Sequence, residues 1–149
     1  MKIDGRCHCG CITYEAEIDP QKVLICHCGD CQTLTGSAFR MVALIYEDKF
    51  KLLSGELKIY VKMGESGTKR QQSFAPNAGR RSIPVVGQEA KVDAIRMDTA
   101  RQRDELVPKK QLWFRSAQRW ITNLGSVPKI ESSLLLTALA AWLELAVET

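Results

Sequence analysis

The stretch ICHCGDCQTLTGSAF, from Ile25 to Phe39, places three cysteines within six positions and then continues with small and hydroxylated residues. The C-x-C pair brings Cys26 and Cys28 together across a turn, and the following C-x-x-C spacing adds Cys31 from the other side. Thiolates are soft ligands, and a tetrahedral zinc ion accepts up to four of them. Three neighbouring ligands with no obvious fourth are typical of catalytic zinc, which keeps one position open. The alternative is a structural zinc knuckle that a remote cysteine completes.

A second cysteine run, CHCGC from Cys7 to Cys11, repeats the letters CHCG and contains the remote cysteines that this alternative needs. Cys7, Cys9 and Cys11 are spaced by two, so an extended chain would present them on one side. Three sulfurs on a straight strand cannot surround a tetrahedral ion without a sharp bend. His8 and His27 lie between cysteines, where ligation is awkward, so we expect them to have supporting or solvent-facing roles.

The composition is that of an ordinary globular domain, with 149 residues, 45% of them hydrophobic and 26% charged. The opening MKIDGR lacks the apolar segment of a signal peptide, so we expect a cytoplasmic protein. In that compartment clustered cysteines more often bind metal than form disulfides. The net charge of +4 comes with short basic pairs rather than a basic stripe. Such pairs favour a solvated face or an anionic small molecule, and nucleic acid is an unlikely partner.

The hydrophobic pattern predicts a mainly β domain. The segment ITYEAEI (12–18) alternates apolar and polar residues, as a half-buried strand does. Glycine in LSGEL (53–57) predicts a turn. Further strands are expected at KVLI (22–25), FRMVALI (39–45), LKIYV (57–61), the end of ESGTKRQQSF (65–74), KVDAIRM (91–97) and QLWFR (111–115).

The tail SSLLLTALAAWLELAVE (132–148) is built from strong helix formers and begins with serines that can cap a helix. It is shorter than the ~20 residues of a membrane span, and it is apolar almost all round. We therefore expect a C-terminal apolar α-helix over residues 132–149 that packs on its own domain or forms a homodimer. A role at a membrane surface is the least favoured of these alternatives.

Four segments carry a family resemblance: GRCHCGCITYEAE (5–17), CHCGDCQTLTGSAF (26–39), SGELKIY (54–60) and ESGTKRQQSFAPNAG (65–79). They resemble the glutathione-dependent formaldehyde-activating enzyme family, which includes the domain of centromere protein V, and the similarity covers residues 3–131. The resemblance implies a β-tent fold of small antiparallel sheets built around zinc-binding cysteine knuckles. It also implies a catalytic zinc on Cys26, Cys28 and Cys31, and a structural zinc held by Cys7, Cys9 and a later C-P-x-C-G knuckle.

The later knuckle is altered in this chain, which reads APNAG at 75–79. Ala75 and Ala78 stand where the family pattern has cysteine, so Cys7 and Cys9 are left as a remnant of the structural site. The sequence therefore predicts one zinc ion per chain. A structural zinc site is worth on the order of 10 kcal/mol. We expect core packing of both alanines and burial of the tail helix to offset its loss. Recruitment of Cys11 together with an outside ligand is the open alternative.

The resemblance further implies a carbon–sulfur lyase-like reaction, in which the glutathione thiol adds to formaldehyde and S-hydroxymethylglutathione forms or is cleaved. Thr35, Gly36 and Ser37 are candidates for binding the substrate, although they could equally order the loop after the cysteines. The alternative function is a non-enzymatic zinc module that binds a protein or nucleic acid. A different small thiol or aldehyde is also compatible with the sequence.

Glutathione is anionic, so basic side chains could meet its carboxylates. Arg40, Lys69 and Arg70 are the candidates near the cysteine motif and in the expected edge strand. Trp113 could line a pocket, but we expect it to be a buried core residue.

Overall fold

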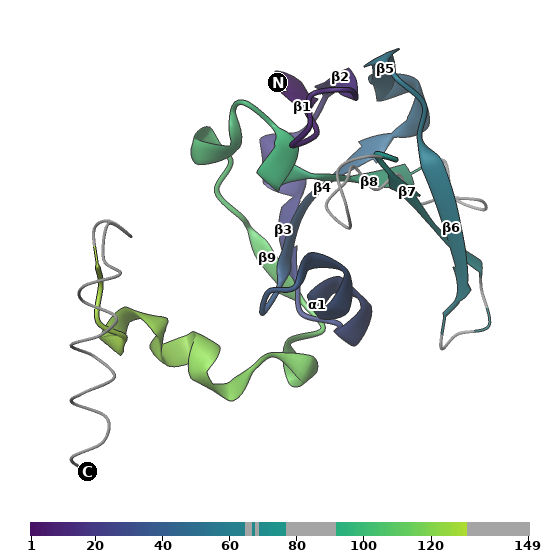
Figure 1. Ribbon diagram of the computed structural model, residues 1–149. Coiled ribbons are helices and arrows are strands. Elements are labelled where there is room, and N and C mark those ends of the chain that lie inside the picture. The colour runs from purple at the N-terminus through teal and green to yellow at the C-terminus, as the bar shows by residue number, and fades with distance from the viewer. Residues whose placement is uncertain (65–66, 68, 77–91, 131–149) are drawn as a thin grey trace, which may run out of the picture. The chain divides into compact units, whose positions relative to one another are not determined.

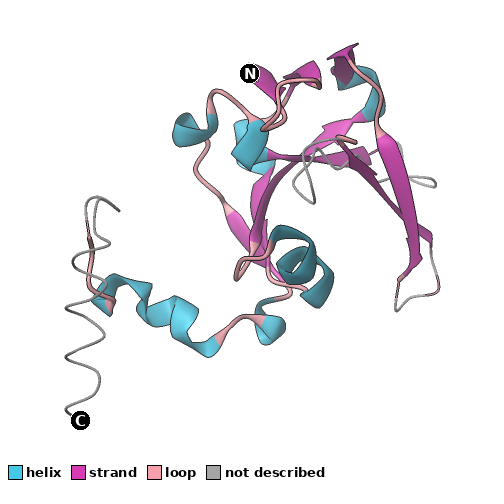
Figure 2. Ribbon diagram, viewed as in Figure 1, coloured by secondary structure: helices cyan, strands magenta, loops and turns pink. Residues whose placement is uncertain are grey.

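The computed structural model describes residues 1–64, 67, 69–76 and 92–130, and the chain divides into two compact units, 1–118 and 119–149. Figure 1 shows that the described part of the first unit is built mainly from short strands, and Figure 2 shows how short its helices are. The strands are β1 (Lys2–Arg6), β2 (Thr13–Glu17), β3 (Val23–Cys26), β4 (Arg40–Tyr46), β5 (Phe50–Ser54), β6 (Lys58–Met63), β7 (Lys69–Phe74), β8 (Val92–Arg96) and β9 (Lys110–Leu112). The helices are α1 (Gly29–Thr35) and the 3-10 helices η1 (Pro20–Lys22), η2 (Glu47–Lys49), η3 (Met97–Thr99), η4 (Arg103–Glu105), η5 (Phe114–Ser116) and η6 (Arg119–Ser126).

The described strands form three small sheets, in the orders β1-β2-β5, β8-β4-β3-β9 and β6-β7. Five of the six strand pairs are antiparallel, whereas β3 and β9 run parallel. The sequence led us to expect only antiparallel pairs, and this expectation is wrong for β3 and β9. The chain reaches β9 only after it has passed through five other described strands, and it then enters the sheet in the direction of β3.

The core of the first unit follows the alternation predicted for β2. Ile12, Tyr14, Ala16 and Ile18 are all buried, while the residues between them are exposed or half-buried. They share one apolar cluster with residues of other strands, including Ile95 of β8. Full burial of a large apolar side chain contributes roughly 1.5–3 kcal/mol, so this cluster accounts for a large part of the stability.

Ala75 belongs to the same cluster and is 2% exposed, and Cys7 belongs to it as well. The expectation that Ala75 packs as plain core is confirmed. Ala78 lies outside the described residues. The C-terminal apolar helix expected over 132–149, with the dimer interface assigned to it, also lies outside them.

The backbone of Gly5 in β1 lies close to the ring of Tyr14 in β2. Gly5 is paired with Tyr14 across the two strands and also forms an isolated bridge with Ala100. A Cβ atom at Gly5 would lie 2.3 Å from the Tyr14 hydroxyl oxygen and 2.5 Å from the Thr99 carbonyl oxygen. The Tyr14 hydroxyl in turn lies 3.0 Å from Thr99 Oγ1, and burial raises the pKa of Tyr14 to about 12. Glycine is therefore required at this position.

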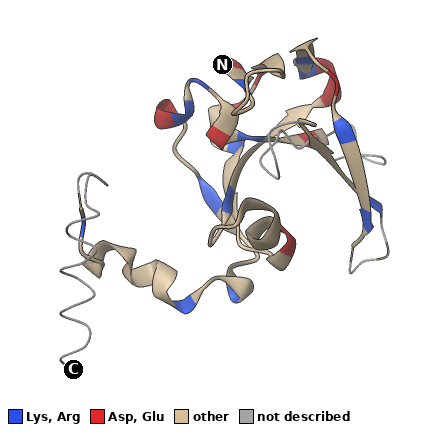
Figure 3. Cartoon of the chain, in the orientation of Figure 1, with Lys and Arg blue, Asp and Glu red and all other residues tan. Residues whose placement is uncertain are grey.

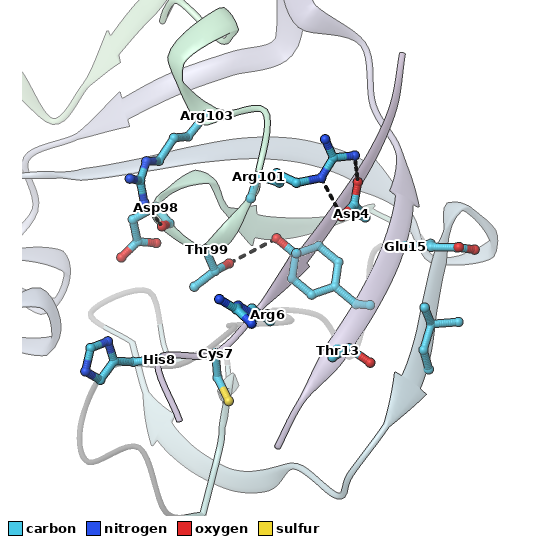
Figure 4. A pocket seen from close by; sticks show the side chains of 14 residues that line it. Asp4, Arg6, Cys7, His8, Thr13, Glu15, Asp98, Thr99, Arg101 and Arg103 are labelled. Atoms are coloured by element: carbon cyan, nitrogen blue, oxygen red, sulfur yellow. Dashed lines mark hydrogen bonds and ion pairs between the residues drawn. The ribbon is translucent and has the colours of Figure 1, made fainter. Parts of the chain in front are cut away.

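An ion pair fastens β1 to the segment after η3 (Figure 4). Arg101 Nε and Nη2 donate to Asp4 at 3.0 and 2.5 Å, and Gln102 Nε2 donates to the same carboxylate at 2.8 Å. These bonds, with Arg101 contributing most, lower the pKa of Asp4 from 3.8 to about 2. Because the folded pKa is depressed, the stabilisation is fully present above pH 3.8 and is lost as the pH falls towards 2.

Asp4→Asn is therefore expected to weaken the dependence of unfolding free energy on pH between pH 4 and pH 2. Urea unfolding at several pH values in this range measures it. Glu15→Gln on the neighbouring strand is the control and should keep the wild-type slope. An unchanged acid slope in Asp4→Asn would show that this carboxylate is not held ionised by Arg101.

The predicted strands are confirmed for β2, β3, β4, β6, β7 and β8, with ends shifted by a few residues at most. The strand expected at 111–115 is wrong after Leu112, because Trp113 adopts a left-handed conformation, with φ of 55°, that turns the chain into η5. Trp113 is 48% exposed and stacks with the Arg115 guanidinium, so its expected place in the core is wrong.

None of the helices in the described part of the chain has the length and apolar character needed to span a bilayer.

Charged residues are spread over the described elements. Figure 3 shows lysine and arginine on several strands and loops, with acidic residues among them, rather than gathered along one element. The basic pairs Lys69-Arg70 and Lys109-Lys110 are exposed, as expected, and Arg80-Arg81 lies outside the described residues.

Candidate metal centres

The three cysteines of the C-x-C-x-x-C motif meet where β3 gives way to α1. Cys26 is the last residue of β3, Cys28 caps the N-terminus of α1, and Cys31 lies in the first turn of that helix. The Cys28 sulfur accepts a hydrogen bond from the backbone N–H of Cys31 at 3.4 Å, as N-cap side chains do. The three sulfurs lie within 4.8 Å of one another. The structure thus brings together the three residues that the spacing singled out, and we call them the tripod.

The tripod sulfurs share protons. The thiol of Cys31 hydrogen-bonds to Cys26 and lowers the pKa of Cys26 to about 5, with a smaller contribution from the Arg40 charge. The pKa of Cys31 is raised, because this residue holds the proton of the pair and is also partly buried. The lowered pKa favours the thiolate form of Cys26, and a thiolate is the form that binds metal.

Arg40 is a buried cation beside the tripod. It is the antiparallel partner of Cys26 across β3 and β4, so the two side chains share one face of the sheet. Its side chain reaches Gln72 of β7 through Nη1 at 3.1 Å, while its buried Nε has no hydrogen-bond partner among the described residues. Burial lowers the pKa of Arg40, and the nearby cysteines act against this shift. An unpartnered donor on a buried charge is costly, so this atom still has a hydrogen bond to offer.

His27 anchors the turn between the first two tripod residues. Its ring is buried between Phe39 and Phe114 at centroid distances of 5.8 and 5.6 Å, and Nε2 lies 2.8 Å from Gln111 Oε1. Its backbone N–H donates to the carbonyl of Leu112 at 3.0 Å. The histidine thus ties the tripod to β9, in agreement with the supporting role expected for it. Its Nδ1 atom is also buried without a partner in the described chain.

The segment after the tripod closes α1. Gly36 adopts a left-handed conformation, with φ of 64°, and donates its N–H to Gln32. The Thr35 hydroxyl donates to the Cys31 carbonyl at 2.7 Å, and the Ser37 hydroxyl donates to the Phe39 carbonyl at 2.5 Å. These contacts give the three candidate substrate-binding residues, Thr35, Gly36 and Ser37, a role in ordering the loop. Their role towards substrate stays a prediction.

The β6-β7 hairpin contacts the tripod region through two polar side chains. Lys62 forms an ion pair with Asp30 of α1, and Gln72 accepts the hydrogen bond from Arg40. Lys69 and Arg70 lie at the start of β7 and are exposed. The structure therefore leaves both side chains open to an anionic ligand, and their proposed contact with glutathione stays a prediction.

The second cysteine run forms the turn of the β1-β2 hairpin. The Sγ atom of Cys7 lies 3.3 Å from that of Cys9 and 3.7 Å from that of Cys11, and the last two are 3.0 Å apart. The turn between Cys7 and Gly10 is closed by a backbone hydrogen bond of 3.0 Å. The premise that these residues lie on a straight strand is wrong, because the sharp bend that three ligands need is present. We call this group the hairpin cluster.

Protonation differs within the hairpin cluster. Burial raises the pKa of Cys7, but hydrogen bonds from the backbone N–H of Ile12 and from the Cys9 and Cys11 thiols outweigh it, so the pKa of Cys7 is lowered to about 7. The hydrogen bond between Cys11 and Cys9 raises the pKa of Cys11 to about 11, and burial adds to this shift. None of the six cysteines forms a disulfide.

A family model for the glutathione-dependent formaldehyde-activating enzyme matches residues 2–116, which is more than half of the chain and includes the tripod and the hairpin cluster. The chain belongs to this family. A comparison with curated proteins finds no match. Membership of the glutathione-dependent formaldehyde-activating enzyme family associates the chain with glutathione and formaldehyde.

The residues of the two clusters fit a thiophilic metal ion. Each cluster places three sulfurs within 4.8 Å of one another. Zinc binds sulfur ligands well, whereas harder cations such as magnesium and calcium prefer oxygen ligands. At the tripod, the buried Arg40 offsets the negative charge that three thiolates would gather. The fit supports a metal-binding member of the formaldehyde-activating family, with zinc as the expected ion.

Sequence reasoning found the cysteines but missed their surroundings. The burial of Arg40 and its bond to Gln72 depend on strand pairing between β3 and β4 and on the β6-β7 hairpin. The aromatic enclosure of His27 depends on Phe114, which lies far along the chain. In the sequence, the feature that pointed to a role for Arg40 was its position directly after the TGSAF motif.

Proposed function

We propose that the protein is a zinc-dependent carbon–sulfur lyase that forms and cleaves the adduct between the glutathione thiol and formaldehyde. The convergence of Cys26, Cys28 and Cys31 at the start of α1 carries this proposal. Membership of the glutathione-dependent formaldehyde-activating enzyme family supports the two substrates.

The tripod thiolates would hold the metal. Zinc bound there supplies deprotonation and positioning of a substrate thiol. Cys28 and Cys31 are fixed by the first turn of α1, and Cys26 is fixed by its pairing with Arg40 in the sheet. These rigid supports favour a defined geometry for three ligands.

Arg40 is assigned to the oxygen of the adduct. When the glutathione sulfur bonds to the formaldehyde carbon, the carbonyl π electrons move to oxygen, which then takes a proton to become the hydroxyl of S-hydroxymethylglutathione. The proton lost by the thiol balances the proton gained by this oxygen. Arg40 carries a positive charge that interacts with the tripod cysteines, so it is suited to stabilise the oxygen electrostatically while it is negatively charged.

The carboxylates of glutathione require cations outside the reacting centre. Lys69 and Arg70 lie exposed on β7, whose Gln72 reaches Arg40. We assign the substrate carboxylates to this end of the hairpin. Thr35 and Ser37 stay as candidates for the peptide groups of the substrate.

The test is the rate of exchange between free and adduct-bound formaldehyde in a glutathione–formaldehyde mixture, measured by NMR exchange spectroscopy. The wild-type protein is expected to accelerate exchange. Cys28→Ala is expected to abolish the acceleration and to lower the zinc content, because it removes one of three ligands. Lys49→Gln, on the β1-β2-β5 side of the unit, is the matched control and should behave as wild type.

A zinc-loaded protein that leaves the exchange rate unchanged would contradict the proposal. Salt-sensitive binding of nucleic acid by the same preparation would then favour the non-enzymatic alternative. Full acceleration by Cys28→Ala would show that the reaction occurs elsewhere.

A further inference from the structure

We infer that Cys7, Cys9 and Cys11 form a second metal site, a three-thiolate site for a thiophilic divalent cation such as zinc, built within the β1-β2 hairpin alone. This inference does not depend on the proposed enzymatic function. It replaces the expectation of one zinc ion per chain with two.

The hairpin turn is shaped to bring the three sulfurs together. The N–H of Cys7 donates to the Ile12 carbonyl at 3.1 Å, and the N–H of Gly10 donates to the Cys7 carbonyl at 3.0 Å. Gly10 has a φ of 78°, a conformation that a glycine adopts without strain. The chain therefore reverses between the first and last cysteine, and Cys11 returns to the side of Cys7.

The sulfur separations are close to those of a zinc site. Zinc–sulfur bonds of about 2.3 Å in tetrahedral geometry place neighbouring sulfurs about 3.8 Å apart. Cys7 and Cys11 are separated by 3.7 Å, while Cys9 lies 3.3 Å from Cys7 and 3.0 Å from Cys11. Cys9 is exposed, so its side chain can rotate and lengthen the two shorter separations without repacking the core.

The surroundings of the sulfurs favour a bound cation over free thiols. Cys7 is 1% exposed, and its sulfur accepts a hydrogen bond from the N–H of Ile12 at 3.3 Å. A backbone N–H bond of this kind stabilises a thiolate. Cys9 and Cys11 are exposed, so solvent can reach the fourth position. Figure 4 shows the His8 ring turned away from the Cys7 sulfur, which leaves a ligand set of sulfur alone.

Cys11 is also fixed from the other side. Its carbonyl accepts a hydrogen bond from Ser54 Oγ at 3.1 Å, and a Cβ atom at Gly55 would lie 2.5 Å from the same carbonyl oxygen. Cys7 directly follows β1, and Ser54 is the last residue of β5. A cation bound by Cys7 and Cys11 would therefore fasten the ends of all three strands of the β1-β2-β5 sheet. It would do so without any ligand from Ala75 or Ala78.

The test is the metal content of reduced, purified protein, combined with variants of each cluster. Wild-type protein is expected to hold two zinc ions per chain. Cys11→Ser and Cys28→Ala should each hold one, and the double variant none. His8→Ala is the matched control and should keep two. Cys28→Ala should remove only the tripod metal and leave the hairpin metal bound. A failure of the proposed enzyme would therefore appear in the exchange rate, whereas a failure of the hairpin site would appear in the zinc content of Cys28→Ala.

A second measurement covers the case in which Cys11→Ser folds poorly. Cadmium is titrated into metal-free Cys28→Ala protein, and the thiolate-to-metal absorption band is followed. Saturation at one equivalent is expected. Absence of the band would overturn the inference. A zinc content of one in wild type that Cys11→Ser leaves unchanged would also overturn it. So would a Cys9–Cys11 disulfide located by mass mapping of the unreduced peptides. A loss of one zinc in His8→Ala would overturn the ligand set of sulfur alone.

Discussion

Replacing Arg40 with methionine is expected to slow adduct exchange by about 100-fold or more, the usual effect of losing a donor to a developing oxyanion. The free energy of unfolding should stay the same or rise. The reason is that Arg40 is buried with an unpartnered Nε and a lowered pKa, and methionine fills similar space without a charge to desolvate. NMR exchange rates and urea unfolding of the same preparations measure both quantities.

Arg96→Met is the matched control. Arg96 is also a buried arginine, on the neighbouring strand β8, but it forms a two-bond ion pair with Asp98, with N···O distances of 3.1 and 2.6 Å. Its loss should lower stability and leave exchange close to the wild-type rate. If Arg40→Met instead lost stability and kept full activity, Arg40 would be a structural residue, and the assignment to the adduct oxygen would be wrong.

Gly5→Ala is expected to destabilise the fold by about 3 kcal/mol or more, at the upper end of the effects of overpacking. The added methyl group would lie 2.3 Å from the hydroxyl oxygen of Tyr14 and 2.5 Å from the carbonyl oxygen of Thr99. Neither can move freely, because Tyr14 is fully buried and the Thr99 oxygen belongs to the backbone. Urea unfolding measures the loss.

Gly29→Ala provides the comparison for this glycine. Nothing lies within 4 Å of a Cβ atom at Gly29, the first residue of α1. Alanine is favoured over glycine in helices by up to about 1 kcal/mol, so this variant should be as stable as wild type or slightly more so. Equal stability of Gly5→Ala and Gly29→Ala would mean that β1 and β2 can separate at Tyr14 without cost.

The strands with regular alternation could be predicted from the sequence, as β2 shows, because a half-buried strand leaves a period of two in its residues. Strand β1 could not be predicted in this way, because KIDGR has a single buried apolar residue, Ile3. α1 was also missed. Its seven residues include no buried side chain, and its N-cap is a cysteine, which is not among the usual capping residues.

The candidate metal ligands were predictable from local spacing alone, since a turn of a few residues decides whether neighbouring sulfurs meet. The same local argument failed for Cys11, because the decisive feature is the reversal of the chain at Gly10. Arg40 required knowledge of strand register, and Trp113 required knowledge that the chain turns at that residue. Long-range pairing is not encoded in any short stretch of residues.

The parallel pairing of β3 with β9 also sets an order of events during synthesis. Leu24, Ile25 and Cys26 find their partners at Lys110, Gln111 and Leu112, so this edge of the sheet stays open until most of the chain has left the ribosome. Contacts between residues so far apart form slowly, and an open strand edge is a site for wrong association. Because Cys26 lies on that strand, a nascent or truncated chain that ends before Lys110 presents its tripod beside an unprotected edge.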